Sequence, residues 1–162
     1  MVRRLLCFLI GACAVPLSFA GTAHADERAL RAEREALQAA LQNVIDELTG
    51  RLKLPAQVTA TLVPANPLLV SVEPGADRTS FVMSFEAGFL QGLTTDELRA
   101  IVAHELGHVW IFTHHPYLQT ERLANNVALR VVSRQSLEQV YSKVWAHGGE
   151  KGDMARFLPA PE

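Results

Sequence analysis

Two histidines and a glutamate stand close together in the segment His104-Glu105-Leu106-Gly107-His108. On an α-helix, residues four apart lie one turn apart on the same face, so His104 and His108 can direct neutral imidazoles at a single point. Zn²⁺ binds imidazole nitrogens in this arrangement. Glu105 lies further round the helix, where it can act on a water molecule instead of binding the metal. The pattern predicts zinc-dependent hydrolysis, in which Glu105 takes a proton from the attacking water and passes it to the leaving amine.

A zinc ion in such a site needs a third protein ligand, and the sequence offers two candidates. Glu121 follows a break at 114–116 and opens a second helix, on which Ala124 is one of several small residues that allow close packing on the first helix. His114 stands where the metzincin peptidases have their third ligand, but Ile111 occupies the turn position at which they have Gly. The sequence therefore favours one zinc ion per chain, bound by His104, His108 and Glu121, with His114 as the alternative to Glu121.

The helices that must position these residues follow from capping and break signals. Thr94 and Glu97 form a capping box, which predicts a helix running to about Thr113. A second helix is expected from about 118 to 132. Ser136 resembles another cap and opens a last helix that ends at 148–149, and the tail 150–162 is expected to be flexible.

The preceding half of the chain predicts one helix and a small sheet. Residues 26–48 carry apolar side chains at helical spacing, either for the core or for a partner helix. Three β-prone runs at 57–63, 68–72 and 80–84 are separated by Pro and Gly breaks, which favours a small antiparallel sheet. The run 80–84 is expected near the cleft, where its edge could align an extended peptide. Together these elements predict an α+β, minimal zincin-like domain over 26–149, with the ligand helix antiparallel to the active-site helix.

Residues 1–25 have the features of a signal peptide. Arg3 and Arg4 precede an apolar stretch, and small residues at 23 and 25 favour cleavage after Ala25. Both cysteines, Cys7 and Cys13, fall inside this segment. The protein is thus expected to be periplasmic or secreted, without a transmembrane helix in the mature chain. An uncleaved anchor and lipidation at Cys13 are the minor alternatives.

Length and charge narrow the class of protein further. With 162 residues and 49% hydrophobic content, the chain can build one core. Loss of Arg3 and Arg4 changes the formal net charge from −2 to −4. No basic surface for nucleic acid or an anionic membrane is expected from this balance.

The motif region resembles a known family, the M48-type gluzincin metallopeptidases. The resemblance is carried by 93–98 running into 101–108, by 81–84 and 88–90 before them, and by 121–125. It implies that His104, His108 and Glu121 bind zinc and that Glu105 is the catalytic base. Asn125 stands where the family usually has Asp, an acceptor for a ligand histidine, and an amide retains that hydrogen bond without the charge.

These patterns lead to one expected function and two competing ones. The expected function is hydrolysis of peptides or unfolded proteins, with His115, Tyr117 or His147 stabilising the oxyanion. A tail lying across the cleft would restrain that activity. The first alternative is a non-catalytic, zinc-stabilised binding or assembly protein, and the second is a helical partner protein that needs no zinc. Composition and spacing do not indicate the oligomeric state.

Overall fold

The computed structural model describes residues 20–149 and 152–159 of the chain. Residues 1–19 of the expected signal peptide, with both cysteines, lie outside them. The elements in order are α1 (Ala20–Leu52), β1 (Gln57–Val63), β2 (Val70–Pro74), β3 (Ser80–Glu86), α2 (Ala87–Leu90), α3 (Thr95–His114), α4 (Glu121–Ala128), α5 (Arg134–Gly148) and α6 (Met154–Phe157). The expected α+β class is confirmed.

The chain divides into two units, one up to Glu33 and one from Arg34 onward. The described part of the first unit is the beginning of α1, where Leu30 is 66% exposed. In the second unit, the remainder of α1 buries Leu41 and Ile45 completely. The apolar stripe predicted for this helix therefore contributes to the core from Leu41 onward. Among the described residues, no helix has the length and apolar character needed to cross a membrane.

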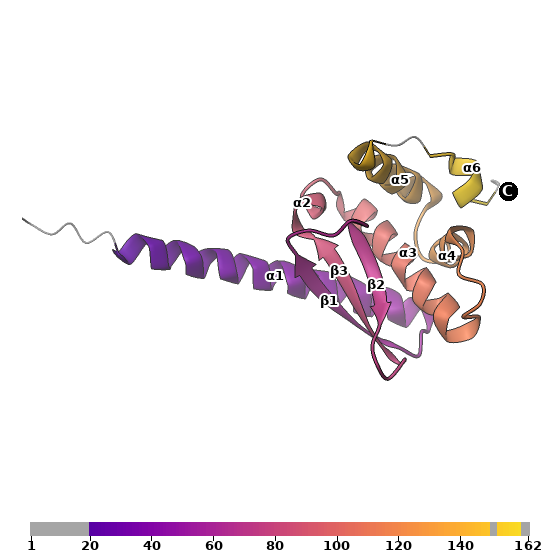
Figure 1. Ribbon diagram of the computed structural model, residues 1–162, viewed down its shortest axis with the longest axis horizontal. Helices are drawn as coiled ribbons and strands as arrows, with labels where there is room; N and C mark the ends of the chain where they lie inside the picture. The colour runs from indigo at the N-terminus through magenta and orange to yellow at the C-terminus, as the bar shows by residue number, and fades with distance from the viewer. Residues whose placement is uncertain (1–19, 150–151, 160–162) are drawn as a thin grey trace, which may run out of the picture. The chain divides into compact units, whose positions relative to one another are not determined.

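The sheet is mixed, so the expectation of an antiparallel sheet is wrong. Its strand order is β1-β3-β2, with β3 parallel to β1 and antiparallel to β2. The physical reason is the position of the β2–β3 hairpin. Its first strand, β2, lies at the far edge from β1, and its second strand, β3, lies between them and runs parallel to β1. One face of the sheet is buried, since alternate residues of β1 and β3 enter the core. In Figure 1, α3 lies between this sheet and the helices α4, α5 and α6.

Polar side chains of α1 cover the outer edge of β1. Three of them, at spacings of four residues, donate to alternate strand carbonyls: Arg34 to Leu62 (2.7 Å), Gln38 to Ala60 (3.0 Å) and Gln42 to Val58 (2.8 Å). Four helical residues rise about 6.0 Å and two strand residues about 6.6 Å, so the two spacings match closely. The edge carbonyls of β1 thereby obtain hydrogen-bond partners from side chains instead of another strand.

The expected capping box opens α3: Thr94 accepts from the Glu97 backbone N–H, and the Glu97 carboxylate accepts from the Thr94 backbone N–H. Lys143 of α5 also donates to that carboxylate at 2.6 Å.

Both later helices differ from their expected bounds. The ligand helix is shorter than 118–132, because Thr120 is its N-cap, and α5 begins after Ser133 instead of at Ser136.

The segment 152–159 is packed against the domain, in contrast to the flexible tail expected from the sequence. Its residues form the short helix α6 and place Leu158 in the core, only 2% exposed. The Phe157 ring contacts the rings of Tyr141 and Trp145 of α5, with centroids 5.4 and 5.8 Å apart. The apolar residues of this segment belong to the hydrophobic core and aromatic packing, and none of them lines the cleft described below.

Candidate metal centre

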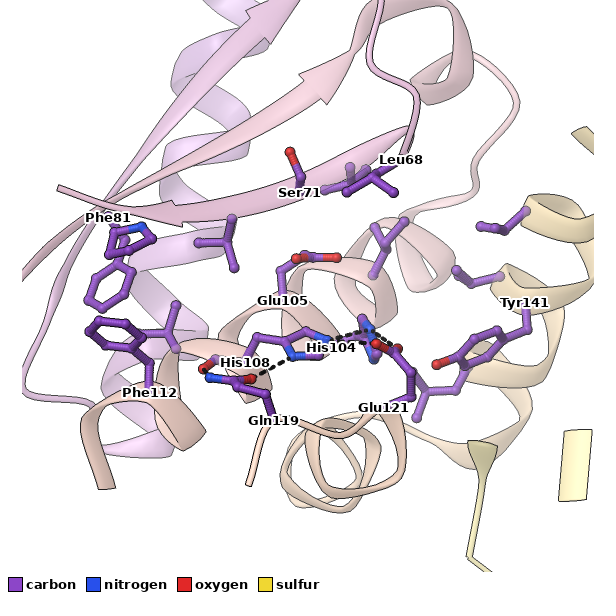
Figure 2. A pocket seen from close by; sticks show the side chains of 18 residues that line it. Leu68, Ser71, Phe81, His104, Glu105, His108, Phe112, Gln119, Glu121 and Tyr141 are labelled. Carbon is purple, nitrogen blue, oxygen red and sulfur yellow. Dashed lines mark hydrogen bonds and ion pairs between the residues drawn. The ribbon is translucent and has the colours of Figure 1, made fainter. Parts of the chain in front are cut away.

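Three of the predicted site residues converge on one point between α3 and α4. The Glu121 carboxylate lies 3.1 Å from His104 Nε2 and 3.4 Å from His108 Nε2. The two Nε2 atoms are themselves 3.2 Å apart. Figure 2 shows the two rings and the carboxylate directed at one another. The four-residue spacing of the histidines and the placement of Glu121 in the first turn of the next helix account for this convergence.

The hydrogen bonds on the other side of each ring fix which nitrogen carries the proton. His104 Nδ1 lies 2.8 Å from Asn125 Oδ1, and His108 Nδ1 lies 3.2 Å from Gln119 Oε1. Both amide oxygens can only accept, so both Nδ1 atoms donate. Gln119 is held in this orientation because its Nε2 donates to the His108 carbonyl at 3.4 Å. When both rings are neutral, each presents an Nε2 lone pair to the common point; when a ring is protonated, its Nε2–H donates to the Glu121 carboxylate.

A cation fits this arrangement of donors. Zinc bonds of about 2.0–2.1 Å in tetrahedral geometry separate neighbouring ligand atoms by about 3.3–3.4 Å. The Nε2–Nε2 separation of 3.2 Å and the 3.1 Å from His104 Nε2 to Glu121 Oε2 are close to that spacing, and the other carboxylate oxygen, Oε1, lies 3.4 Å from His108 Nε2. Two imidazoles and one carboxylate form a set seen in catalytic zinc sites, where the fourth position stays open. His104, His108 and Glu121 thus form a candidate metal-binding group.

The close approach of the two helices depends on Gly107, inside the motif itself. A Cβ atom at this position would lie 2.4 Å from the carbonyl oxygen of Ala124 and 2.8 Å from its Cα. Only a residue without a side chain allows the α4 backbone to pass here. The small residues on both helices therefore bring Glu121 within reach of the two histidines, as their spacing suggested.

Glu105 lies beside the three converging residues, with its carboxylate in the cleft between α3 and the edge strand β2 (Figure 2). It is only 8% exposed. Burial raises the pKa of its carboxyl group, and the charged forms of His104 and His108 and a hydrogen bond from the Val72 backbone oppose that rise. A buried carboxylate with a raised pKa is a better proton acceptor than an exposed one, as general-base chemistry requires.

The two ligand types also stabilise one another electrostatically. Burial lowers the pKa of His108, but its hydrogen bond to Glu121 and the nearby carboxylates outweigh burial, so the pKa is raised. The hydrogen bonds from His104 and His108 hold the pKa of Glu121 far below its usual value. Glu121 therefore stays ionised over the whole physiological pH range, which is the form that binds a cation.

A cavity of about 440 Å³ extends from these polar groups. Its polar lining consists of Ser71, His104, Glu105, His108, Gln119, Glu121 and Tyr141. Most of the remaining lining is apolar and comes from β2, β3, α3 and α5, including Val70, Val72, Phe81, Ile101, Val109, Phe112, Leu137, Val140 and Val144. The site thus combines a small cluster of ionisable groups with an apolar wall, as in many clefts that bind organic ligands.

The remaining candidates from the sequence lie elsewhere. His114 ends α3, where its ring stacks on Trp110 at a centroid distance of 4.4 Å. Tyr117 is 97% exposed and His115 is exposed, while His147 contacts Phe89. None of these four lines the cavity, so the three oxyanion candidates and the alternative ligand do not meet the other site residues.

Tyr141 is the site residue that sequence reasoning missed. Its ring packs edge-on against His104 at 5.9 Å, and its hydroxyl accepts from Asn125 Nδ2 at 2.7 Å. Burial raises the pKa of this hydroxyl, so it stays protonated. The signal was present in the sequence, because Tyr141 shares a helical stripe with Leu137, Val140 and Val144, which all line the cavity.

Residues 80–84 form a strand near the cleft, as expected, and Phe81 lines the cavity, but this strand cannot offer its edge to a peptide. Residues 80–84 belong to β3, whose two edges pair with β1 and β2. A central strand has no free edge for a peptide. Val70 and Val72 of the edge strand β2 also line the cavity, and the Val72 backbone N–H reaches Glu105.

No family model and no curated protein matches this chain. Among solved structures, the metallopeptidase zymogen of Pyrococcus abyssi abylysin is similar at 12% identity and a TM-score of 0.49. That match covers 70% of this chain and 99% of the other. A likeness of this degree assigns neither family nor activity. The donor geometry alone indicates the chemistry of the site: two histidines and a glutamate are placed to bind one metal ion beside a buried carboxylate.

Proposed function

We propose that this protein is a zinc-dependent metallopeptidase. The observation that carries the proposal is the convergence of two Nε2 lone pairs and the Glu121 carboxylate at separations of 3.1 to 3.4 Å. When both rings are neutral these are three electron-pair donors, and their mutual repulsion is removed by a metal cation between them or by a proton on an Nε2 atom. The adjoining cavity and Glu105 distinguish the site from a closed structural zinc site, which usually has four protein ligands.

The chain's own residues have distinct roles in the proposed reaction. When bound, zinc supplies a Lewis acid that polarises a peptide carbonyl and lowers the pKa of water. Glu105 takes the proton of the attacking water and returns it to the leaving amine, a transfer for which its raised pKa is suited. Tyr141 accepts one hydrogen bond from Asn125, and its own hydroxyl proton can be donated to the Glu121 carboxylate beside it.

The cavity supports a peptide or unfolded protein as substrate, bound in extended form. The outer edge of β2 can supply backbone carbonyls to a peptide strand, because Val70 and Val72 both line the cavity; their N–H groups already reach Leu68 and Glu105. The apolar wall formed with α3 and α5 would accommodate a large apolar side chain next to the scissile bond. We therefore expect cleavage beside residues such as Leu or Phe.

A digest of unfolded casein with Glu105→Gln tests the proposal. The amide cannot accept the water's proton, so turnover should fall by about 10²- to 10⁴-fold while zinc content stays that of the wild type. Glu73→Gln is the matched control, because Glu73 is an exposed β2 residue that does not line the cavity. Equal turnover by Glu105→Gln and the wild type would refute the role of Glu105.

Zinc analysis of the purified wild type separates the proposal from its alternatives. Purified protein that contains no zinc would contradict the proposed metal site. The helical partner protein, which needs no zinc, would then be the remaining alternative. A chain that holds one zinc but cleaves no peptide would instead support a zinc-stabilised binding or assembly protein. Only stoichiometric zinc together with Glu105-dependent cleavage fits the metallopeptidase.

A further inference from the structure

Asn125 connects the ligand His104 to the C-terminal segment 152–159. The side chain is completely buried, and all of its polar atoms are used. Its Oδ1 faces His104 Nδ1 at 2.8 Å, while its Nδ2 donates to the Tyr141 hydroxyl at 2.7 Å and to the Phe157 carbonyl at 2.9 Å. A residue of α4 thereby joins the candidate metal centre to a backbone atom more than thirty residues later in the chain.

Only one of these three partners fixes the direction of the Asn125 amide. A neutral imidazole can donate or accept at Nδ1, according to its tautomer, and a hydroxyl can do either. The Phe157 carbonyl can only accept, so the NH₂ group must face it and the amide oxygen must face His104. The proton of the neutral ring then resides on Nδ1, and the Nε2 lone pair is free. A flipped amide would place the proton on Nε2, where it would block the metal.

The segment that supplies this carbonyl has its own anchors, away from the metal ligands. Leu158 is buried in the core, and Arg134 of α5 donates to the Pro159 carbonyl. Gly152 lies directly against Trp145, so closely that no side chain could replace its hydrogen. The position of the Phe157 carbonyl is therefore set by packing on α5 and not by the metal centre.

We propose that the segment 152–159 positions His104 for metal binding, by holding the Asn125 amide in the orientation that accepts from His104 Nδ1 and turns Nε2 toward the candidate metal centre. Phe157 acts through its backbone carbonyl as a positioning residue. The inference explains why position 125 carries an amide: a carboxylate there would place an oxygen against the Phe157 carbonyl, where two acceptors repel. It rests on the proposed metal site, but its first two tests require no metal.

The first test uses the full-length, metal-free protein. Nitrogen-15 NMR of the His104 ring should show the proton on Nδ1 in the wild type. A ring without a proton on Nδ1 would overturn the inference, whether or not the protein proves to bind zinc.

The second test measures how strongly Asn125 holds the C-terminal segment 152–159 on the domain. Trypsin can cut after the exposed Arg156 once the segment detaches. Asn125→Asp should increase the rate of this cut about tenfold or more, because it exchanges a buried hydrogen bond for a repulsion. Asn126→Asp is the control, since it makes the same change at the neighbouring, exposed residue and should leave the rate unchanged. Equal rates in the two variants would contradict the link.

The third test measures zinc affinity by competition with a chelator. Leu158→Ala loosens the segment without altering any group in the metal centre, and zinc should bind about 10- to 100-fold more weakly. Leu48→Ala removes an equally buried leucine of α1 and should leave the affinity near that of the wild type. If Asn125→Asp does not fold, this pair decides the inference. A similar loss in both variants would show general destabilisation and refute the proposed role. Wild-type protein that binds no zinc would instead refute the proposed function, and the first test would still decide this inference.

Discussion

Gly107→Ala should disrupt the metal centre through sterics alone. The new Cβ would meet the Ala124 carbonyl oxygen at 2.4 Å, whereas ordinary contact begins at 3.4 Å. The clash is with backbone atoms, so α4 must move by about 1 Å. Zinc sites tolerate displacements of about 0.2 Å in ligand position. Since α4 carries Glu121, we expect zinc affinity to fall about 10- to 100-fold and the overpacked interface to cost about 1–3 kcal/mol of stability.

The assay for Gly107→Ala pairs chelator competition for zinc with thermal unfolding of the metal-free protein. Gly50→Ala is the matched control, because Gly50 also lies in a helix but has open space around its missing side chain. That variant should gain up to about 1 kcal/mol from helix propensity and bind zinc like the wild type. Wild-type zinc affinity in Gly107→Ala would refute the argument that the close approach of α3 and α4 sets the third ligand.

Three further predictions follow from the site, the helix cap and the N-terminus. Glu121→Ala should abolish tight zinc binding, whereas His114→Ala should leave it nearly intact, as measured by the same competition; the reverse order would exclude Glu121 as the ligand. Burial tends to raise the pKa of Glu97, but hydrogen bonds from Lys143 and Thr94 outweigh it and hold the pKa below 4.5. This carboxylate therefore stabilises the fold above about pH 4.5, and its contribution is lost as the pH falls through the lowered pKa. The free energy of unfolding of Glu97→Gln should be about 1–3 kcal/mol lower than that of the wild type near pH 7, and the difference should vanish once the pH falls below the lowered pKa; a difference independent of pH would contradict the assignment. Mass spectrometry of exported protein should find a mature chain that begins at Asp26, and a chain that retains residue 1 would contradict cleavage.

Local signals predicted the helix that carries the chemistry. The capping box at Thr94 and Glu97 involves only neighbouring residues, so the start of α3 could be inferred without knowledge of the fold. The convergence of His104 and His108 required only the helical repeat. The third residue, Glu121, could be inferred because small side chains on both helices indicated close packing, which the contact at Gly107 bears out.

Long-range pairing was not accessible in the same way. The β-prone runs located the strands, but strand direction depends on which neighbour a hairpin places beside β1, and no local residue encodes that choice. The role of the C-terminal segment was missed for a similar reason. Its apolar residues looked unpartnered in the sequence, although Leu158 and Phe157 find their partners on distant elements.

The polar side chains of α1 limit how many copies of this sheet can join. A strand edge can recruit another molecule only if its backbone groups are unpaired, and growth into a fibre needs two such edges per sheet. Arg34, Gln38 and Gln42 already occupy the carbonyls of β1, so among the described strands only β2 keeps an edge without a covering side-chain ladder. A sheet with a single open edge can pair with one further strand only. Pairing through it ends at two copies, and a bound peptide would close it.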